Sequence, residues 1–169
     1  MGDCNLSAFA GIRALILDFD GVLTDNTVTV SSDGVESVAC WRSDGIGTAA
    51  LQAVGIPVVV LSKERDPVVA VRCNKLGLPF HQGVDEKLPR LIEILSELNV
   101  DPEHTAYVGN DINDMECLHH VGLPVAVADA HPMVFAGARY VTKASGGRGA
   151  VREVCDLILE ASAAGSTTD

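Results

Sequence analysis

The chain has 169 residues, of which 47% are hydrophobic and only 4% are aromatic, and its formal net charge is −11. This length is that of one domain with a substantial core, and the abundant small aliphatic side chains suit helices packed on a parallel sheet. The negative charge argues against nucleic acid or an anionic membrane as the main partner.

The first strong pattern is an apolar run from Ala14 to Leu17 that ends in two carboxylates, Asp18 and Asp20, followed by Gly21. A short apolar run that stops at a glycine turn is typical of a strand buried on both faces of a parallel sheet. Two carboxylates about 4 Å apart repel each other by about 4 kcal/mol at an effective dielectric constant of about 20. Because oxygen ligands suit Mg²⁺, this strand end indicates a magnesium site.

A β-hairpin is expected next, over residues 27–41. Two β-prone runs, Thr27–Ser31 and Val35–Trp41, lie on either side of an Asp-Gly turn. Because a hairpin cannot lie within a strand–helix repeat, we expect it to project from the sheet. Its apolar side chains then need cover, which self-association would supply.

The rest of the chain alternates between strands and helices. Strands are expected at residues 57–61, 79–81, 105–108, 124–128 and 140–142, and helices at 46–53, 67–76, 88–98, 113–121, 132–136 and 150–161. This alternation predicts an α/β fold with a doubly wound parallel sheet in a single domain, 1–169. Only the small, polar segment 163–169 looks frayed.

Polar residues follow the later strands as well. Ser62 comes after the strand at 57–61, Lys87 precedes the helix at 88–98, and Asn110, Asp111 and Asp114 follow the strand at 105–108. Ser62 can donate to a phosphate oxygen, Lys87 can hold a phosphate and offset the acids, and Asp111 with Asp114 can complete a Mg²⁺ shell. Each alone could be a helix cap or a solvated side chain. Together at one sheet edge they predict a phosphate site with a metal.

The five cysteines are odd in number and never occur as Cys-x-x-Cys: Cys4, Cys40, Cys73, Cys117 and Cys155. They fit neither a disulfide framework nor a zinc knuckle and favour a reducing cytoplasm. Residues 1–11 lack the features of a signal peptide, and no apolar run approaches the ~18 residues of a membrane span. We therefore expect a cytoplasmic protein without membrane contact.

Two further patterns have simpler explanations. The segment 45–50, with Glu64 after the next strand, imitates a dinucleotide-binding fingerprint. The run before it belongs to the hairpin, however, and Asp44 would repel a pyrophosphate, so a nucleotide-dependent oxidoreductase is not favoured. His119 and His120 are adjacent on a helix and point about 100° apart, which suits surface and packing positions better than a metal pair.

The order Asp-x-Asp, Ser, Lys and Gly-Asn-Asp-x-x-Asp resembles the haloacid dehalogenase superfamily of phosphohydrolases. The segments 18–25 and 145–153, with the hairpin, resemble more narrowly its capless phosphatases, which act on 3-deoxy-octulosonate 8-phosphate or on nonulosonate 9-phosphates. The resemblance covers residues 12–160. It implies a domain without a cap, Mg²⁺-dependent hydrolysis of a sugar-acid phosphate through an aspartyl-phosphate, and a homotetramer.

The resemblance also implies roles for single residues. Asp18 would be the nucleophile, and Asp20 would protonate the leaving alkoxide and then activate water. Mg²⁺ would be held by Asp18, by the Asp20 carbonyl and by a residue of the loop after Gly109. Related enzymes commonly carry Asp where Asn110 stands, so the direct ligand in that loop is either Asn110 or Asp111.

Substrate binding is expected from Ser62, Lys63 and Lys87, and from Arg148 of a neighbouring subunit, which would grip the sugar carboxylate. The segment Lys63-Glu64-Arg65 replaces the Gly-Arg typical of the octulosonate enzymes and looks more like the phosphatase-like domain fused to sialic acid cytidylyltransferases. The resemblance therefore implies either an octulosonate or a nonulosonate as the sugar. An alternative is a weak or inactive phosphatase-like oligomerisation module of sialic-acid activation, although Asp18 and Asp20 favour an enzyme.

Overall fold

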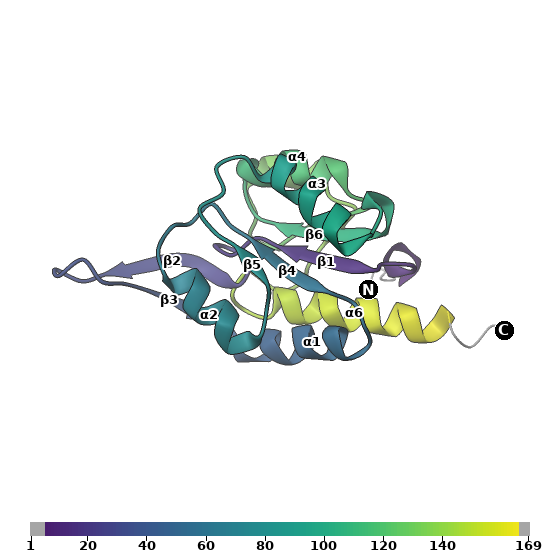
Figure 1. Cartoon of the computed structure of the whole chain (residues 1–169), viewed down its shortest axis with the longest axis horizontal. Helices are drawn as coiled ribbons and strands as arrows, with labels where there is room; N and C mark the ends of the chain where they lie inside the picture. Colours follow the sequence, from purple (N-terminus) through teal and green to yellow (C-terminus); the bar gives the residue numbers. More distant parts are fainter. Residues whose placement is uncertain (1–5, 166–169) are drawn as a thin grey trace.

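The computed structural model describes residues 6–165 and has a six-stranded, all-parallel sheet at its centre (Figure 1). The strand order is β5-β4-β1-β6-β7-β8. The strands are β1 (Ala14–Leu17), β4 (Val58–Leu61), β5 (Phe80–His81), β6 (Thr105–Gly109), β7 (Leu123–Ala126) and β8 (Tyr140–Val141). The central strands β1, β4 and β6 are buried along their whole length, and β1 and β4 are entirely apolar, as expected for strands that helices cover on both faces.

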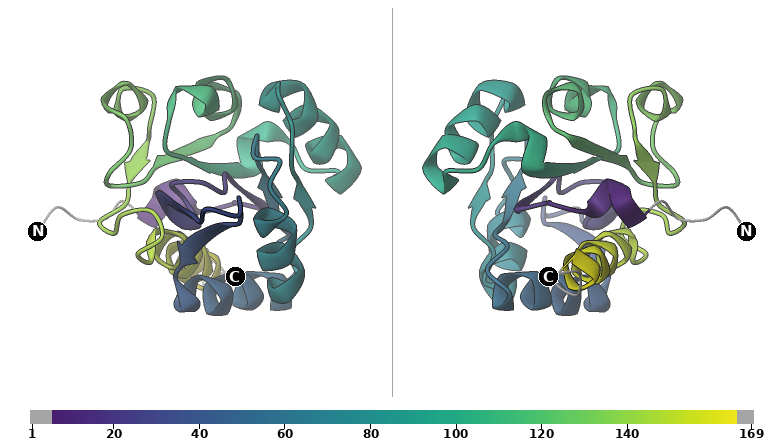
Figure 2. Two further views of the ribbon diagram at one scale, coloured as in Figure 1. Left: turned by 90° about the vertical axis from the view of Figure 1, so that its left-hand side faces the viewer. Right: turned by 90° about the vertical axis from the view of Figure 1, so that its right-hand side faces the viewer.

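Helices cover both faces of this sheet (Figure 2). One face carries α1 (Arg42–Ala53), α2 (Val68–Leu76) and α6 (Ala150–Gly165), and the other carries α3 (Lys87–Leu98), α4 (Met115–His120) and α5 (Pro132–Phe135). Three short 3-10 turns, η1 (Leu6–Phe9), η2 (Pro102–His104) and η3 (Ile112–Asp114), complete the described elements. The predicted doubly wound α/β fold is confirmed.

The strand order fixes the position of the site. From the middle strand β1 the chain passes to β4 and β5 on one side, then returns to β6 and continues outward to β7 and β8. The loops that follow β1 and β6 therefore diverge to opposite sides, which leaves a crevice at the carboxyl ends of these two strands. Ligands of open α/β sheets bind at this switch point, where the sequence predicts the polar side chains.

The hairpin consists of β2 (Thr24–Val30) and β3 (Glu36–Cys40), which pair antiparallel and project from the body of the molecule (Figure 1). It begins three residues earlier than predicted, and its register shifts between Thr24 and Val28. Val28 and Val30 are 52% and 60% exposed, so the single chain leaves them uncovered. Between β1 and β4 the chain forms only this hairpin and α1, and no cap domain is present there.

The glycines that imitate a nucleotide-binding loop have a packing function. A Cβ atom at Gly45 would lie 2.7 Å from the Leu76 side chain of α2, and one at Gly47 would lie 2.9 Å from the Cys155 side chain of α6. They allow α1 to pack closely against both helices, and α1 begins at Arg42 instead of the predicted position 46. Helix α6 also extends beyond the predicted 161 to Gly165, so residues 163–165 are helical, whereas 166–169 lie outside the described residues.

The cysteines of the described residues are free, with three buried and Cys40 partly buried, while Cys4 lies outside that range. No helix within residues 6–165 is long and apolar enough to cross a membrane.

Asp44 is a fully buried carboxylate where α1 meets α6. Its Oδ1 accepts a hydrogen bond from the backbone N–H of Arg152 at 3.0 Å, and its Oδ2 has no hydrogen-bond partner among the described residues. Burial raises the pKa of Asp44 to about 6, although the Arg152 N–H and the charges of Arg72 and Arg152 oppose this. Asp44 therefore takes up its proton at a higher pH in the folded chain than in the unfolded chain.

We expect the stability that Asp44 contributes to be full below its unfolded pKa, near 3.8, and to be lost as the pH rises through about 6. Asp44→Asn keeps an acceptor for the Arg152 N–H without the charge. It should raise the free energy of unfolding by up to about 3 kcal/mol at pH 8 and change it little at pH 4. Denaturant unfolding at both pH values measures this, and a pH-independent difference would contradict it.

Candidate active site

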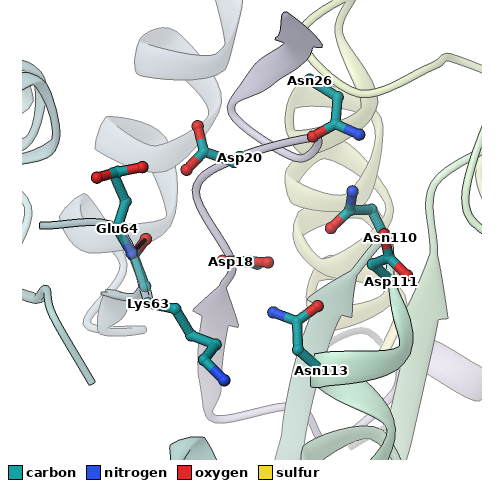
Figure 3. Close-up of a pocket in the computed structure, with 9 residues that line it drawn as sticks. Asp18, Asp20, Asn26, Lys63, Glu64, Asn110, Asp111 and Asn113 are labelled. Carbon is teal, nitrogen blue, oxygen red and sulfur yellow. Dashed lines mark hydrogen bonds between the residues drawn. The ribbon is translucent and has the colours of Figure 1, made fainter. Parts of the chain in front are cut away.

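A pocket of about 110 Å³ opens at the carboxyl ends of β1 and β6 (Figure 3). Its walls come from the loops after β1, β4 and β6 and from the first residues of the hairpin. The lining residues are Asp18, Asp20, Asn26, Ser62, Lys63, Glu64, Asn110, Asp111 and Asn113. Most of the predicted site residues therefore meet here, and we call this space the catalytic pocket. Lys87, Asp114 and Arg148 are not among its lining residues.

Lys87 lies buried beside Asp18. Its Nζ is 2.7 Å from Asp18 Oδ1 and 2.8 Å from Asp114 Oδ1, and all three side chains are at most 6% exposed. Burial alone would lower the pKa of Lys87, but the two carboxylates outweigh it and raise the pKa. Lys87 therefore stays charged and uses two of its three N–H groups to hold these acids. Its predicted contact with the substrate phosphate stays a prediction.

Asp114 has a different position from the predicted one. Its Oδ1 accepts hydrogen bonds from Tyr107 Oη at 2.7 Å and from Lys87, and its Oδ2 accepts from the backbone N–H groups of Asn110 and Asp111 at 3.0 and 3.4 Å. Because protein donors occupy both oxygens and the side chain is fully buried, the structure does not bring Asp114 to the pocket as a metal ligand. It orders the loop after β6 and fixes Lys87. Tyr107 was not predicted as a member of this cluster.

The charge balance around Asp18 is incomplete. Two buried carboxylates share the single ammonium of Lys87, and burial followed by the Asp114 charge raises the pKa of Asp18 to about 7, against the effect of Lys87. Oδ1 of Asp18 accepts from Lys87 and from the Phe19 N–H at 2.7 Å, whereas no hydrogen bond to Oδ2 is found in the described residues. A cation in the pocket near this carboxyl group would favour its ionised form.

The loop after β6 presents an amide oxygen as a further possible ligand. Gly21 has a left-handed φ of +74°, and a Cβ atom there would lie 2.0 Å from Asn110 Nδ2. Gly21 thus lets the Asn110 side chain lie against the loop that carries Asp18 and Asp20 (Figure 3). Asp111 also lines the pocket, but its Oδ1 caps η3 by accepting from the Ile112 N–H at 2.7 Å. Carboxylate, carbonyl and amide oxygens form a donor set that suits Mg²⁺.

Asp20 and Ser62 face the same pocket. Burial, then the nearby Glu64, raises the pKa of Asp20, while Lys87 and a hydrogen bond from Thr24 lower it less. A raised pKa suits a carboxyl group that must protonate a leaving alkoxide. Ser62 is 1% exposed, and its Oγ accepts from the Glu64 N–H at 3.1 Å, which leaves the hydroxyl proton available for an acceptor in the pocket.

Lys63 lies at the edge of the pocket with an exposed side chain (Figure 3). Its ammonium is well placed to meet an anionic ligand that enters from solvent.

Arg148 lies elsewhere. It pairs with Asp25 Oδ2 of its own chain at 2.9 Å, and its side chain is 58% exposed. A Cβ atom at Gly146 would lie 1.8 Å from the Gly21 carbonyl oxygen, and the Gly147 N–H donates to the Val22 carbonyl at 2.9 Å. Glycine at positions 146 and 147 thus allows close contact with the loop after β1 of the same chain. A contribution of Arg148 to a neighbouring subunit stays a prediction.

Three lining residues were not predicted as site residues: Asn26, Glu64 and Asn113. Asn113 belongs to the Gly-Asn-Asp-x-x-Asp motif at residues 109–114, and this position could have indicated that it lies near the pocket. Asn26 has a left-handed φ of +61°, which sequence alone does not reveal.

Removal of the Lys87 charge should affect both activity and stability. Lys87→Met leaves Asp18 and Asp114 buried without a cation, so we expect a loss of about 3–5 kcal/mol in the free energy of unfolding. The matched control is Lys63→Met, which removes an exposed ammonium from the same pocket and should change stability by less than about 0.5 kcal/mol. Denaturant unfolding compares the two variants. Equal stabilities would refute the assignment of Lys87 as the buried cation that holds Asp18 and Asp114.

The chain has close relatives. Residues 80–154 match the family model of the haloacid dehalogenase-like hydrolases. Over 151 residues the chain is 44% identical to the 3-deoxy-D-manno-octulosonate 8-phosphate phosphatase of Yersinia pestis, which covers 89% of this chain and 81% of the relative.

Solved structures agree with this match. The phosphatase of the same name from Moraxella catarrhalis, in complex with magnesium ion, phosphate ion and KDO, superimposes with a TM-score of 0.89 at 32% identity over 97% of each chain. The cobalt-bound deoxy-D-mannose-octulosonate 8-phosphate phosphatase from Haemophilus influenzae gives a TM-score of 0.89 at 34% identity, over 96% of this chain and 95% of that chain.

Proposed function

Because this chain belongs to the haloacid dehalogenase-like hydrolases of the 3-deoxy-D-manno-octulosonate 8-phosphate phosphatase type, we propose that it hydrolyses a sugar-acid phosphate through an aspartyl-phosphate on Asp18. The observation that carries this proposal is Asp18 itself, with Oδ1 held by buried Lys87 and Oδ2 left for the pocket. The relatives favour the octulosonate 8-phosphate as substrate. The nonulosonate 9-phosphate is the second candidate, because the segment Lys63-Glu64-Arg65 differs from the Gly-Arg typical of the octulosonate enzymes.

The reaction follows from the two carboxylates. Oδ2 of Asp18 attacks phosphorus, the bond from phosphorus to the sugar oxygen breaks, and the Asp20 carboxyl gives its proton to the departing alkoxide. Asp20, now ionised, takes a proton from a water molecule whose oxygen attacks the same phosphorus. The P–O bond to Asp18 breaks, inorganic phosphate leaves, and both carboxyl groups return to their starting states. Ser62 and Lys63 orient the phosphoryl oxygens.

The residues that would hold a divalent cation are Asp18, Asp20 through its backbone carbonyl, and Asn110 through its amide oxygen. All three line the catalytic pocket, and the excess negative charge around Asp18 supports a cation there. When bound, Mg²⁺ supplies positive charge that lets an anionic carboxylate approach an anionic phosphate. With Asn110 in place of the usual carboxylate, the ligand set carries one negative charge fewer.

The proposal is tested by phosphate release from both sugar phosphates, octulosonate 8-phosphate and nonulosonate 9-phosphate, with p-nitrophenyl phosphate as a generic ester. We expect Mg²⁺-dependent turnover, with faster hydrolysis of the octulosonate ester. Faster hydrolysis of the nonulosonate ester would change the assigned substrate but not the proposed reaction. No release from any of the three would favour the alternative, an oligomerisation module.

We further propose that the protein is a cytoplasmic homotetramer assembled through the hairpin. The exposed Val28 and Val30 support this, because closed symmetry is the usual way for soluble chains to cover such a surface. Light scattering should give about four times the chain mass of 17.7 kDa, and Val30→Lys should lower it. A monomeric mass for the wild-type chain at micromolar concentration would refute the assembly.

A further inference from the structure

A second cavity adjoins the catalytic pocket at the base of the hairpin. Its volume is about 330 Å³, three times that of the catalytic pocket, and falls within the range of small-molecule sites. Asp20, Asn26 and Glu64 line both spaces. The other lining residues are Thr27, Val28, Glu36, Val38 and Val68. Because Asp20 is the proposed acid for the departing alkoxide, this second space is where the leaving group would lie, and we call it the leaving-group cavity.

The charge of this cavity limits what it can bind. Its charged lining residues are Asp20, Glu36 and Glu64, all acidic, and none of the lysines or arginines in residues 6–165 lines it. A second carboxylate or phosphate placed here would meet like charges without a counter-ion. Hydroxyl groups, in contrast, can donate hydrogen bonds to carboxylates, and the valine side chains can contact the C–H faces of a sugar chain. The cavity therefore suits an uncharged, hydroxylated segment.

Asn26 is the one amide that borders both spaces. Its φ of +61° belongs to the left-handed region, and its backbone N–H donates to Thr24 Oγ1 at 3.3 Å, where the hairpin register shifts. No hydrogen bond to its side-chain amide is found in the described residues, and Figure 3 places that amide beside the pocket, between Asp20 and Asn110. An amide both donates and accepts, so it can bind a hydroxyl group in either sense.

We propose that Asn26, together with Glu36, recognises hydroxyl groups on the carbon atoms next to the phosphoester, so that Asn26 is a specificity-determining residue. The carboxylate of a sugar acid then lies outside the leaving-group cavity. This inference rests on the proposed phosphatase function. It means that the hairpin of the same chain takes part in substrate recognition.

The test compares two substrates and two matched variants. Asn26→Gly removes the amide at a left-handed position that glycine adopts freely, and Asn99→Gly makes the same change at the other left-handed non-glycine residue, at the end of α3 and outside both cavities. The substrates are the sugar phosphate that the wild type hydrolyses faster and its analogue without the hydroxyl on the carbon next to the phosphoester.

In the wild type, loss of that hydroxyl should lower kcat/KM about tenfold. Asn26→Gly should lower kcat/KM about tenfold for the full substrate only, so that the two substrates become nearly equal, while Asn99→Gly should behave as the wild type. Glu36→Gln should weaken the preference for the hydroxyl in the same direction.

Equal losses on both substrates in Asn26→Gly, or no loss on either, would overturn the inference while leaving the phosphatase function intact. A wild type that hydrolyses neither ester would instead refute the proposed function. The two failures are therefore distinguishable.

Discussion

Asp18→Asn is expected to lower phosphate release by at least about a thousandfold without loss of stability. The amide cannot form the covalent bond to phosphorus, so the lower activity follows directly from the proposed chemistry. The same substitution removes one of two buried carboxylates that share the charge of Lys87. The variant should therefore unfold at the same denaturant concentration as the metal-free wild type, or at a higher one.

The control for this experiment is Asp85→Asn. Asp85 is an exposed carboxylate that pairs with Arg65 at the surface, so its removal should change neither activity nor stability appreciably. Activity in Asp18→Asn close to that of the wild type would contradict the mechanism. Lost activity together with marked destabilisation would contradict our description of the buried charges.

Removal of the divalent cation is expected to abolish activity as completely as the loss of Asp18. Without the cation the excess negative charge around Asp18 is unbalanced, and the pKa of Asp18 is raised to about 7, so an anionic phosphate would meet a poorly prepared nucleophile. Exhaustive chelation should stop phosphate release, and added Mg²⁺ should restore it. Asn110→Ala should raise the Mg²⁺ concentration needed for half activation. Full activity in a sample with no measurable metal would contradict this prediction.

Much of the fold could be predicted because its central strands are easily recognised in the sequence. The run Ala14–Leu17 is apolar throughout, which is typical of a strand with helices on both faces of its sheet. The alternation of strands and helices along the chain then allows few topologies. Once β1 is central, the ends of β1 and β6 must form the switch point, so Asp18, Asp20 and Asn110 were expected to meet. The structure brings all three to the catalytic pocket.

The partners of the individual carboxylate oxygens could not be predicted in the same way. The spacing of Asp111 and Asp114 indicates a shared loop, but the backbone N–H groups of that loop, with Tyr107 and Lys87, compete for Asp114 and occupy it. A sequence pattern does not show which donors compete for a carboxylate. Asn26 has its left-handed conformation within the hairpin segment where the register shifts, and no sequence pattern indicates that shift, so its place in the pocket also required the structure.

The aspartyl-phosphate can be detected by trapping phosphate on Asp18. Asp20→Asn lacks the base that activates water, whereas p-nitrophenyl phosphate has a leaving group that needs little protonation, so the first step should proceed and the second should stall. After an acid quench, we expect about one phosphoryl group per chain, labile to alkali, on the peptide that contains Asp18. The same experiment with Asp18→Asn should give none. A label on another residue, or release of p-nitrophenol in the first turnover without any label on the protein, would contradict the account.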